Sequence, residues 1–207
     1  QAVCDEDFRH SVVKVADEAP KERLMRKHID PATGAMTNVV DDERITNGVY
    51  LGQNQEIIDN WVRSLWVDIV QPATGQTIEW FERPMLMCYD KGGLFKTHAD
   101  NGYLDRNNNR YVTVLNRDLS MLVYINSEFE GGNITFNHFN YSYKPQAGDL
   151  LFFPSDQRYL HTAETVTAGT RYCIVSWAAV KGSARVSPDP PADALFIKKR
   201  WWQRFTR

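Results

Sequence analysis

The chain has 207 residues, a length that fits one large domain better than two small ones, and 43% of them are hydrophobic, enough for a sizeable core. Lysine and arginine number 24 against 26 aspartate and glutamate, so the net charge of −2 argues against a nucleic acid or an anionic membrane as partner. The longest apolar runs are strand-sized, far below the ~20 residues of a membrane-spanning helix. Three cysteines cannot form a fully paired disulfide framework, so we expect a reducing, cytoplasmic location.

The N-terminal part, residues 1–83, is expected to be mainly helical. Pro20 suits the first position of a helix over 21–27, because its missing N–H group is not needed there. Over residues 54–70, apolar side chains recur every three or four positions, which predicts a helix with one buried face. The segment 72–75 contains proline and glycine and is expected to end that helix.

After Pro84 the sequence changes to short stretches rich in Val, Ile, Tyr, Phe and Thr, separated by turn residues. Such a series is typical of a β-sandwich or jelly roll, and helices would cover one of its sheets. The sequence therefore predicts a single, mainly β domain with flanking helices: helical support over about 1–83, a β core over about 84–180 and a tail over 181–207. The expected strands are 85–90, 95–99, 111–117, 119–126, 133–138, 149–154, 158–164 and 170–178.

Two histidines and one aspartate are candidates for a metal site. His98 and Asp100 lie two residues apart at the end of a predicted strand, so their side chains point to the same face. A His-x-Asp pair is common by chance and is equally compatible with a surface histidine beside a solvated aspartate. His161, on another predicted strand, completes two imidazoles and one carboxylate, the facial triad of non-haem Fe(II) oxygenases. Such a triad leaves coordination positions open for a bidentate co-substrate and dioxygen, whereas a structural zinc site would need a fourth protein ligand.

Arg171 follows His161 by ten residues, after a turn, and begins a predicted strand. On that strand it shares one face with Cys173, Val175 and Trp177. A buried guanidinium is tolerated only when it is paired, and its planar fork suits a carboxylate. Its partner could be an anionic ligand or, with equal weight, a protein Asp or Glu in a structural ion pair.

Six motifs follow one another between Met85 and Ala178: Cys88–Asp100, Leu122–Asn126, Gly131–Phe136, Pro145–Phe153, His161 and Gly169–Tyr172. In these motifs the chain resembles the Fe(II)- and 2-oxoglutarate-dependent dioxygenases, specifically the prolyl 4-hydroxylase branch. The resemblance implies a double-stranded β-helix, a cupin-like jelly roll, with iron at one open end. Within the branch, Arg171, Asn101 and the segment 150–156 look more like the oxygen-sensing, hypoxia-factor type than the collagen type.

The resemblance also implies a role for each matching residue. His98, Asp100 and His161 match the iron ligands. Arg171 matches the residue that holds the distal carboxylate of 2-oxoglutarate. Two tyrosines match residues that hydrogen-bond to this co-substrate and one tryptophan matches an aromatic wall of its pocket, although core packing is the first interpretation of aromatic strand residues. The implied cofactors are Fe(II), 2-oxoglutarate as co-substrate and O₂, with ascorbate as an optional addition. The residues matched to co-substrate binding are Tyr89, Tyr124, Arg171 and Trp177.

The segment Asn101–Tyr111 leaves its strand directly after Asp100 and is rich in Gly, Asp and Asn. These residues favour turns over a regular strand ladder, so we expect a mobile lid that covers the substrate. An ordinary solvated loop is the alternative. The candidate substrate-binding residues in this segment are Tyr103, Arg106 and Arg110.

The tail from Leu195 to Arg207 interleaves aromatic and basic residues. A terminal helix that packs its aromatic side chains onto the barrel is favoured over a segment that binds RNA or a membrane surface. The sequence leaves the role of this tail open.

The predicted activity is hydroxylation of a C–H bond, coupled to conversion of 2-oxoglutarate and O₂ to succinate and CO₂. On the resemblance alone, the first candidate substrate is a prolyl residue in a peptide or protein, and a free amino acid or small metabolite is the alternative. A non-catalytic cupin-like module that binds a metal or sugar gives no reason for an anion-binding Arg171. A nucleic-acid demethylase is disfavoured by the near-neutral charge. No membrane partner is expected, and the sequence leaves the oligomeric state open.

Overall fold

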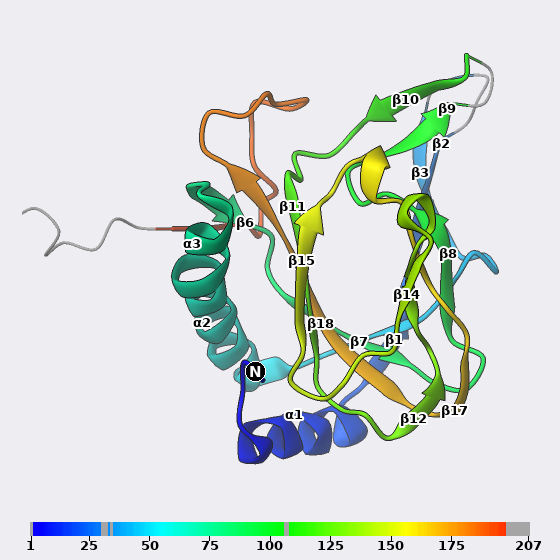
Figure 1. The fold of residues 1–207 in the computed structure, drawn as a ribbon, viewed down its shortest axis with the longest axis vertical. Coiled ribbons are helices and arrows are strands. Elements are labelled where there is room, and N and C mark those ends of the chain that lie inside the picture. The colour runs from blue at the N-terminus through cyan, green and yellow to red at the C-terminus, as the bar shows by residue number, and fades with distance from the viewer. Residues whose placement is uncertain (1, 30–32, 34, 106–107, 198–207) are drawn as a thin grey trace, which may run out of the picture.

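The computed structural model describes residues 2–29, 33, 35–105 and 108–197. Two mainly antiparallel sheets face each other and curl into an open barrel, while the helices lie along the outer side of the larger sheet (Figure 1). The predicted mainly β fold with flanking helices, a double-stranded β-helix, is therefore confirmed. Among the described residues, none of the helices combines the length and the apolar character needed to span a membrane.

The larger sheet has eight strands and the smaller sheet has five. In the larger sheet the order is β1 (Lys21–Arg23), β5 (Asn47–Val49), β7 (Met85–Tyr89), β18 (Arg171–Val180), β11 (Leu119–Tyr124) and β15 (Leu150–Pro154). Strand β6 (Ile78–Phe81) pairs with β18, and β19 (Leu195–Phe196) pairs with β6. In the smaller sheet the order is β14 (Tyr141–Tyr143), β13 (Ile134–Phe136), β16 (His161–Ala163), β8 (Leu94–His98) and β4 (Arg44–Ile45). The two-stranded pairs are β2 (Arg26–Ile29) with β3 (Met36–Val39), β9 (Gly102–Asp105) with β10 (Arg110–Thr113), and β12 (Phe129–Gly131) with β17 (Val166–Gly169).

The helical elements are α1 (Glu6–Glu18), α2 (Gln55–Leu65), a π-helical turn η2 (Trp66–Val70), α3 (Gln71–Thr74) and the 3₁₀ turns η1 (Gly52–Asn54), η3 (Asn137–Phe139) and η4 (Gln157–Tyr159). The helix predicted over 54–70 is confirmed. As expected, the segment 72–75 ends it: the last helical residue is Thr74, and Gly75 follows with a φ of +68°. The π turn changes the hydrogen-bond pattern just before the proline, which has no N–H group to donate.

The prediction of a helix over 21–27 is wrong, because residues Lys21–Arg23 form strand β1. Strand β1 pairs with β5, and the chain on either side is held by backbone bonds from Tyr50 to Pro20 (3.0 Å) and from Leu24 to Thr46 (2.9 Å). Five short strands thus lie between α1 and α2, in a region expected to be mainly helical. Pairing with distant strands outweighs the local preference of this segment.

Several other expected elements differ in the structure. The strand expected over 158–164 is divided into η4 and β16, and β10 ends at Thr113 rather than at residue 117. The helix expected in the tail is absent at its start, where Leu195–Phe196 pairs with β6 as β19. The remainder of that tail, residues 198–207, lies outside the described residues.

Strand β18 separates two hydrophobic clusters. Tyr172 and Ile174 face a cluster between the larger sheet and the helices, which also contains the fully buried Trp66. Cys173 and Trp177 face a second cluster inside the barrel. This alternation agrees with the two faces predicted for the strand. The side chain of Arg171 therefore enters the barrel from the start of β18.

Strand β8 contains a bulge opposite β16. His161 pairs with His98 and Ala163 pairs with Phe95. Between these two pairs β8 has two residues and β16 has one, so β8 contains one extra residue. In a regular strand Phe95 and His98 would face opposite sides. Here their rings stack with centroids 3.6 Å apart, so both face the same side of the strand.

Candidate active site

Strand pairing brings the three candidate metal ligands together. His98 ends β8, His161 begins β16, and Asp100 follows β8 by two residues. The Nε2 atom of His98 lies 3.6 Å from Asp100 Oδ1, and the Nε2 atom of His161 lies 3.7 Å from Asp100 Oδ2. One candidate ligand atom from each residue lies within 4.8 Å of the other two. This is the arrangement that the sequence predicted.

Backbone carbonyl groups fix the orientation of both imidazoles. His98 Nδ1 lies 2.8 Å from the carbonyl oxygen of Lys96, and His161 Nδ1 lies 3.0 Å from that of Tyr159. A carbonyl oxygen only accepts, so each Nδ1 donates its hydrogen. In the neutral ring Nε2 then keeps its lone pair, which is the form that binds a metal.

The surroundings keep His161 and Asp100 in the charge states of metal ligands. Burial lowers the pKa of His161 to about 4, with His98 contributing in the same direction, so the imidazole is neutral at pH 7. Burial alone would raise the pKa of Asp100, but the two imidazoles and the Ser120 hydroxyl outweigh it and hold this pKa well below its usual range. Ser120 donates to Asp100 Oδ2 at 2.6 Å and lies 2.8 Å from the Ser155 hydroxyl.

Arg171 is a buried cation without a protein carboxylate among the described residues. Its side chain is 2% exposed, and Nη1 donates to the carbonyl oxygen of Gly132 at 2.6 Å. The guanidinium lies 4.0 Å from the ring centroid of Tyr89. Its Nε atom is buried and has no hydrogen-bond partner within residues 2–29, 33, 35–105 and 108–197. The arrangement favours an anionic ligand over the structural ion pair that the sequence left open.

The aromatic residues matched to co-substrate binding lie in the same interior cluster. Tyr89 pairs with Arg171 across β7 and β18, and Tyr124 pairs with Cys173 across β11 and β18. Burial raises the pKa of Tyr124 well above its usual value, so its hydroxyl remains a hydrogen-bond donor. The indole N–H of Trp177 is buried and has no hydrogen-bond partner in the described part of the chain. Tyr89, Tyr124 and Trp177 thus belong to one cluster inside the barrel, and Arg171 contacts it through the ring of Tyr89.

The segment expected to be an irregular lid is largely a β-hairpin. Strands β9 and β10 pair regularly, with Tyr103 opposite Val112, and the hairpin rises above the barrel (Figure 1). The expectation that this segment avoids a regular ladder is wrong. Gly102 permits the ladder, because a Cβ atom there would meet the carbonyl oxygen of Val112. Tyr103 is partly buried, Arg110 is exposed, and Arg106 lies outside the described residues.

Two further arginines adjoin the site and were not expected from the sequence. Arg117 pairs with Glu82 through two short bonds of 2.6 and 2.5 Å, donates to the carbonyl oxygen of Asp100 at 3.1 Å and stacks over Trp177 at 3.6 Å. Arg44 lies 4.9 Å from the ring centroid of Phe95, the ring that stacks on His98. Their partners come from distant parts of the chain, so no local pattern in the sequence indicated them.

Residues 84–179 match the sequence profile of the 2OG-Fe(II) oxygenase superfamily. The chain is 30% identical over 98 residues to a PKHD-type hydroxylase from Psychrobacter sp. (strain PRwf-1), a match that covers 45% of this chain and 36% of that protein. It is 34% identical over 89 residues to human prolyl 3-hydroxylase 2, covering 39% of this chain and 13% of that protein. The matched region thus spans well under half the length of these relatives.

Solved structures share the fold at low sequence identity. A viral collagen prolyl hydroxylase from Paramecium bursaria Chlorella virus-1, solved with 2OG, superposes with a TM-score of 0.59 at 14% identity, covering 87% of this chain and 94% of that chain. A prolyl hydroxylase from Trichoplax adhaerens, solved with a peptide fragment of a hypoxia inducible factor, gives 0.55 at 18% identity, covering 84% and 90%. Residues 84–179, which contain His98, Asp100, His161 and Arg171, therefore match the 2OG-Fe(II) oxygenase superfamily in sequence, and the chain shares the fold of these solved structures.

Proposed function

We propose that this chain is a 2-oxoglutarate-dependent hydroxylase. The observation that carries the proposal is the buried Arg171, which lacks a described carboxylate partner and lies in the same barrel as the His98–Asp100–His161 cluster. A binding module that holds only a metal would not need a second, anion-seeking group. A 2-oxoglutarate-dependent hydroxylase needs both groups: the His98–Asp100–His161 cluster for the metal and Arg171 for the co-substrate.

The residues present fit the two groups that the superfamily implies. Two imidazoles and a carboxylate suit Fe(II), and the Nε atom of Arg171, which has no hydrogen-bond partner among the described residues, suits the distal carboxylate of 2-oxoglutarate. When bound, the iron supplies dioxygen activation and oxidation of the C–H bond.

The remaining tasks fall to the side chains of this chain. The Lys96 and Tyr159 carbonyl groups hold the imidazoles so that both Nε2 atoms face Asp100, and Ser120 holds the carboxylate. Arg171 orients the co-substrate, and Tyr124 donates a hydrogen bond from its buried hydroxyl. Tyr89 and Trp177 form apolar walls that exclude water. Positioning and exclusion of side reactions are the protein's share of the chemistry.

A prolyl residue in a peptide or protein is the proposed substrate, and a cytoplasmic location belongs to the same proposal. Several relatives have names that specify prolyl hydroxylation, and one similar structure contains a bound peptide. The β9–β10 hairpin follows Asp100 in sequence and rises above the barrel, where it would meet a substrate chain (Figure 1). A free amino acid is the alternative substrate.

The proposal is tested by succinate formation with Fe(II), 2-oxoglutarate and a panel of prolyl peptides and free amino acids. One member of the panel should stimulate succinate formation in proportion to hydroxylated product, and NMR of the product locates the hydroxyl group. Consumption of 2-oxoglutarate by the wild-type protein but not by Asp100→Ala supports the role of the cluster. Equal consumption by both proteins would contradict it.

A further inference from the structure

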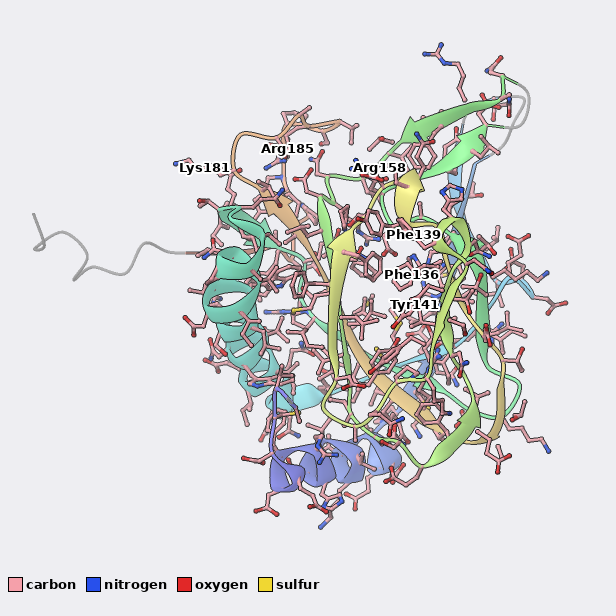
Figure 2. All side chains as sticks on the ribbon, viewed as in Figure 1. Phe136, Phe139, Tyr141, Arg158, Lys181 and Arg185 are labelled. Atoms are coloured by element: carbon pink, nitrogen blue, oxygen red, sulfur yellow. The ribbon has the colours of Figure 1, made fainter. Side chains whose placement is uncertain are left out.

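An aromatic groove lies where the two sheets separate. It has a volume of about 480 Å³ and lies between β15, the last strand of the larger sheet, and β13–β14, the edge of the smaller sheet. Figure 2 shows three of its residues, labelled beside β14, on one side of the opening. The lining residues are Phe136, Phe139, Tyr141, Leu151, Phe152, Phe153 and Tyr159.

Ring contacts connect the groove with the candidate metal site. Phe139 contacts Tyr159 with centroids 5.1 Å apart, and Tyr159 stacks on Phe153 at 6.3 Å. Phe153 in turn meets the imidazole of His161 edge-on at 4.9 Å. The backbone of Tyr159 also accepts the bond from His161 Nδ1. The groove therefore adjoins the candidate metal site, with the ring of Phe153 between the groove and His161.

The outer part of the groove is apolar yet exposed to solvent. Phe139 is 55% exposed and Tyr141 is 53% exposed, and none of the seven lining residues carries a charge. Adjacent exposed aromatic residues mark a surface that gains free energy when a partner covers it. A charged side chain placed there would lose water without gaining an opposite charge.

We infer that the aromatic groove binds an uncharged, apolar stretch of a peptide substrate, on one side of the residue that reacts at the metal. The inference rests on the proposed function and deepens it, because it selects a peptide over a free amino acid. The two bordering strands, β14 and β15, are both sheet edges, so their outer backbone groups can bond to an extended chain. Proline-rich segments also suit such a site, because aromatic-lined grooves accept their preformed extended helix.

The test compares Phe139→Ala and Tyr141→Ala with Tyr50→Ala. Tyr50 is a matched control, because it is 73% exposed and does not line the groove. The substrates are a prolyl peptide with apolar flanking residues, two versions with aspartate on one side or the other of the prolyl residue, and free proline. Michaelis constants come from succinate formation. Fluorescence polarisation of the labelled apolar peptide, with Mn(II) in place of iron, measures binding without turnover.

Each groove variant should weaken peptide binding about tenfold, the loss typical of an interface aromatic residue, and should raise the ratio of the peptide KM to the free-proline KM. Aspartate should weaken binding on one side of the prolyl residue only. Tyr50→Ala should match the wild type in both assays. Circular dichroism checks that the variants are folded.

The outcomes separate the two proposals. If neither peptides nor amino acids stimulate succinate formation, the proposed function fails. Suppose instead that peptides are hydroxylated, that the groove variants bind the apolar peptide as tightly as the wild type, and that both aspartate peptides bind the wild type as tightly as the apolar peptide does. The proposed function then stands and the groove inference is wrong. If the variants instead convert a dimer to a monomer in sedimentation without altering peptide binding, the groove holds a second copy of this chain and the inference is equally overturned.

Discussion

His98 and His161 are direct cross-strand partners in the β8–β16 ladder, and the centroids of their rings lie 4.3 Å apart. The register of two strands therefore sets the spacing of both imidazoles. Asp100 lies beyond the ladder, and its main-chain N–H donates to the carbonyl oxygen of Ser155 at 3.1 Å. The carboxylate is the ligand whose orientation depends most on hydrogen bonds from outside the two strands.

Ser120→Ala should weaken metal binding without removing a ligand. The hydroxyl fixes Asp100 Oδ2, and loss of such a supporting bond typically costs ten- to a hundredfold in metal affinity. Asp100→Ala should abolish both metal binding and turnover. Titration with Mn(II) or Co(II) measures the affinity, and Ser64→Ala, on the exposed surface of α2, is the control. Wild-type affinity in Ser120→Ala would show that the carboxylate does not need this bond.

Arg171→Lys and Arg171→Ala should raise the concentration of 2-oxoglutarate needed for half-maximal rate. Loss of a buried, charge-assisted pair costs on the order of 2–5 kcal/mol, which corresponds to about thirtyfold or more. Lysine keeps the positive charge but lacks the planar, bidentate guanidinium group. The rise in the KM for 2-oxoglutarate should therefore be smaller for Arg171→Lys than for Arg171→Ala. Arg158→Lys, at an exposed pair with Asp156, is the control. An unchanged KM in both Arg171 variants would exclude the assigned role.

The β9–β10 hairpin is predicted to act as a lid over the substrate. Its regular strand pairing is compatible with this role, because the hairpin can move as one unit. Tyr103→Ala, Arg106→Ala and Arg110→Ala should lose coupling, so that 2-oxoglutarate is consumed without matching product. The reason is that a closed hairpin would position the substrate and keep water out. The measurement is the ratio of succinate to hydroxylated product with the best peptide substrate. Wild-type ratios in all three variants would rule out the lid.

Stability should fall as the pH rises above about 9, and Cys173 should contribute to this loss. Burial raises the pKa of Cys173 to about 12, whereas an unfolded thiol ionises near 8.5. Above that pH the unfolded chain releases a proton that the folded chain retains, so unfolding becomes easier by at most about 1.4 kcal/mol per pH unit. Urea midpoints between pH 8 and 10 measure the slope. Cys173→Ala should flatten it, whereas Cys4→Ala, at a half-buried position, should change it less.

The sequence predicted the interior of the barrel well because alternation along a strand determines which side chains share a face. Arg171, Cys173 and Trp177 face the interior as expected, and His161 meets His98 as required. The prediction failed where tertiary pairing overrides local preference. The segment after Pro20 has the composition of a helix, yet it forms strand β1 because its backbone pairs with β5.

The groups around the candidate site were harder to predict. Arg117 meets Glu82 across 35 positions of sequence, and neither residue belongs to a local motif. Phe139 ends the 3₁₀ turn η3, and Tyr141 begins β14 two residues later. The start of that turn was expected to be the end of a strand over 133–138. Their joint exposure depends on how far the two sheets separate, which no periodicity in the sequence encodes.

The bulge in β8 is a point at which the strand can lose one residue without turning the candidate metal ligand His98 to the other face. Lys96 and Thr97 fill the stretch between Phe95 and His98, where β16 has a single residue. Replacing either side chain leaves the count unchanged. Deleting one of them would leave a single residue between the two pairs on both strands, so a regular ladder would still place Phe95 and His98 on the same face. Within this family of folds, chains should therefore vary at this point in residue number as well as in residue type.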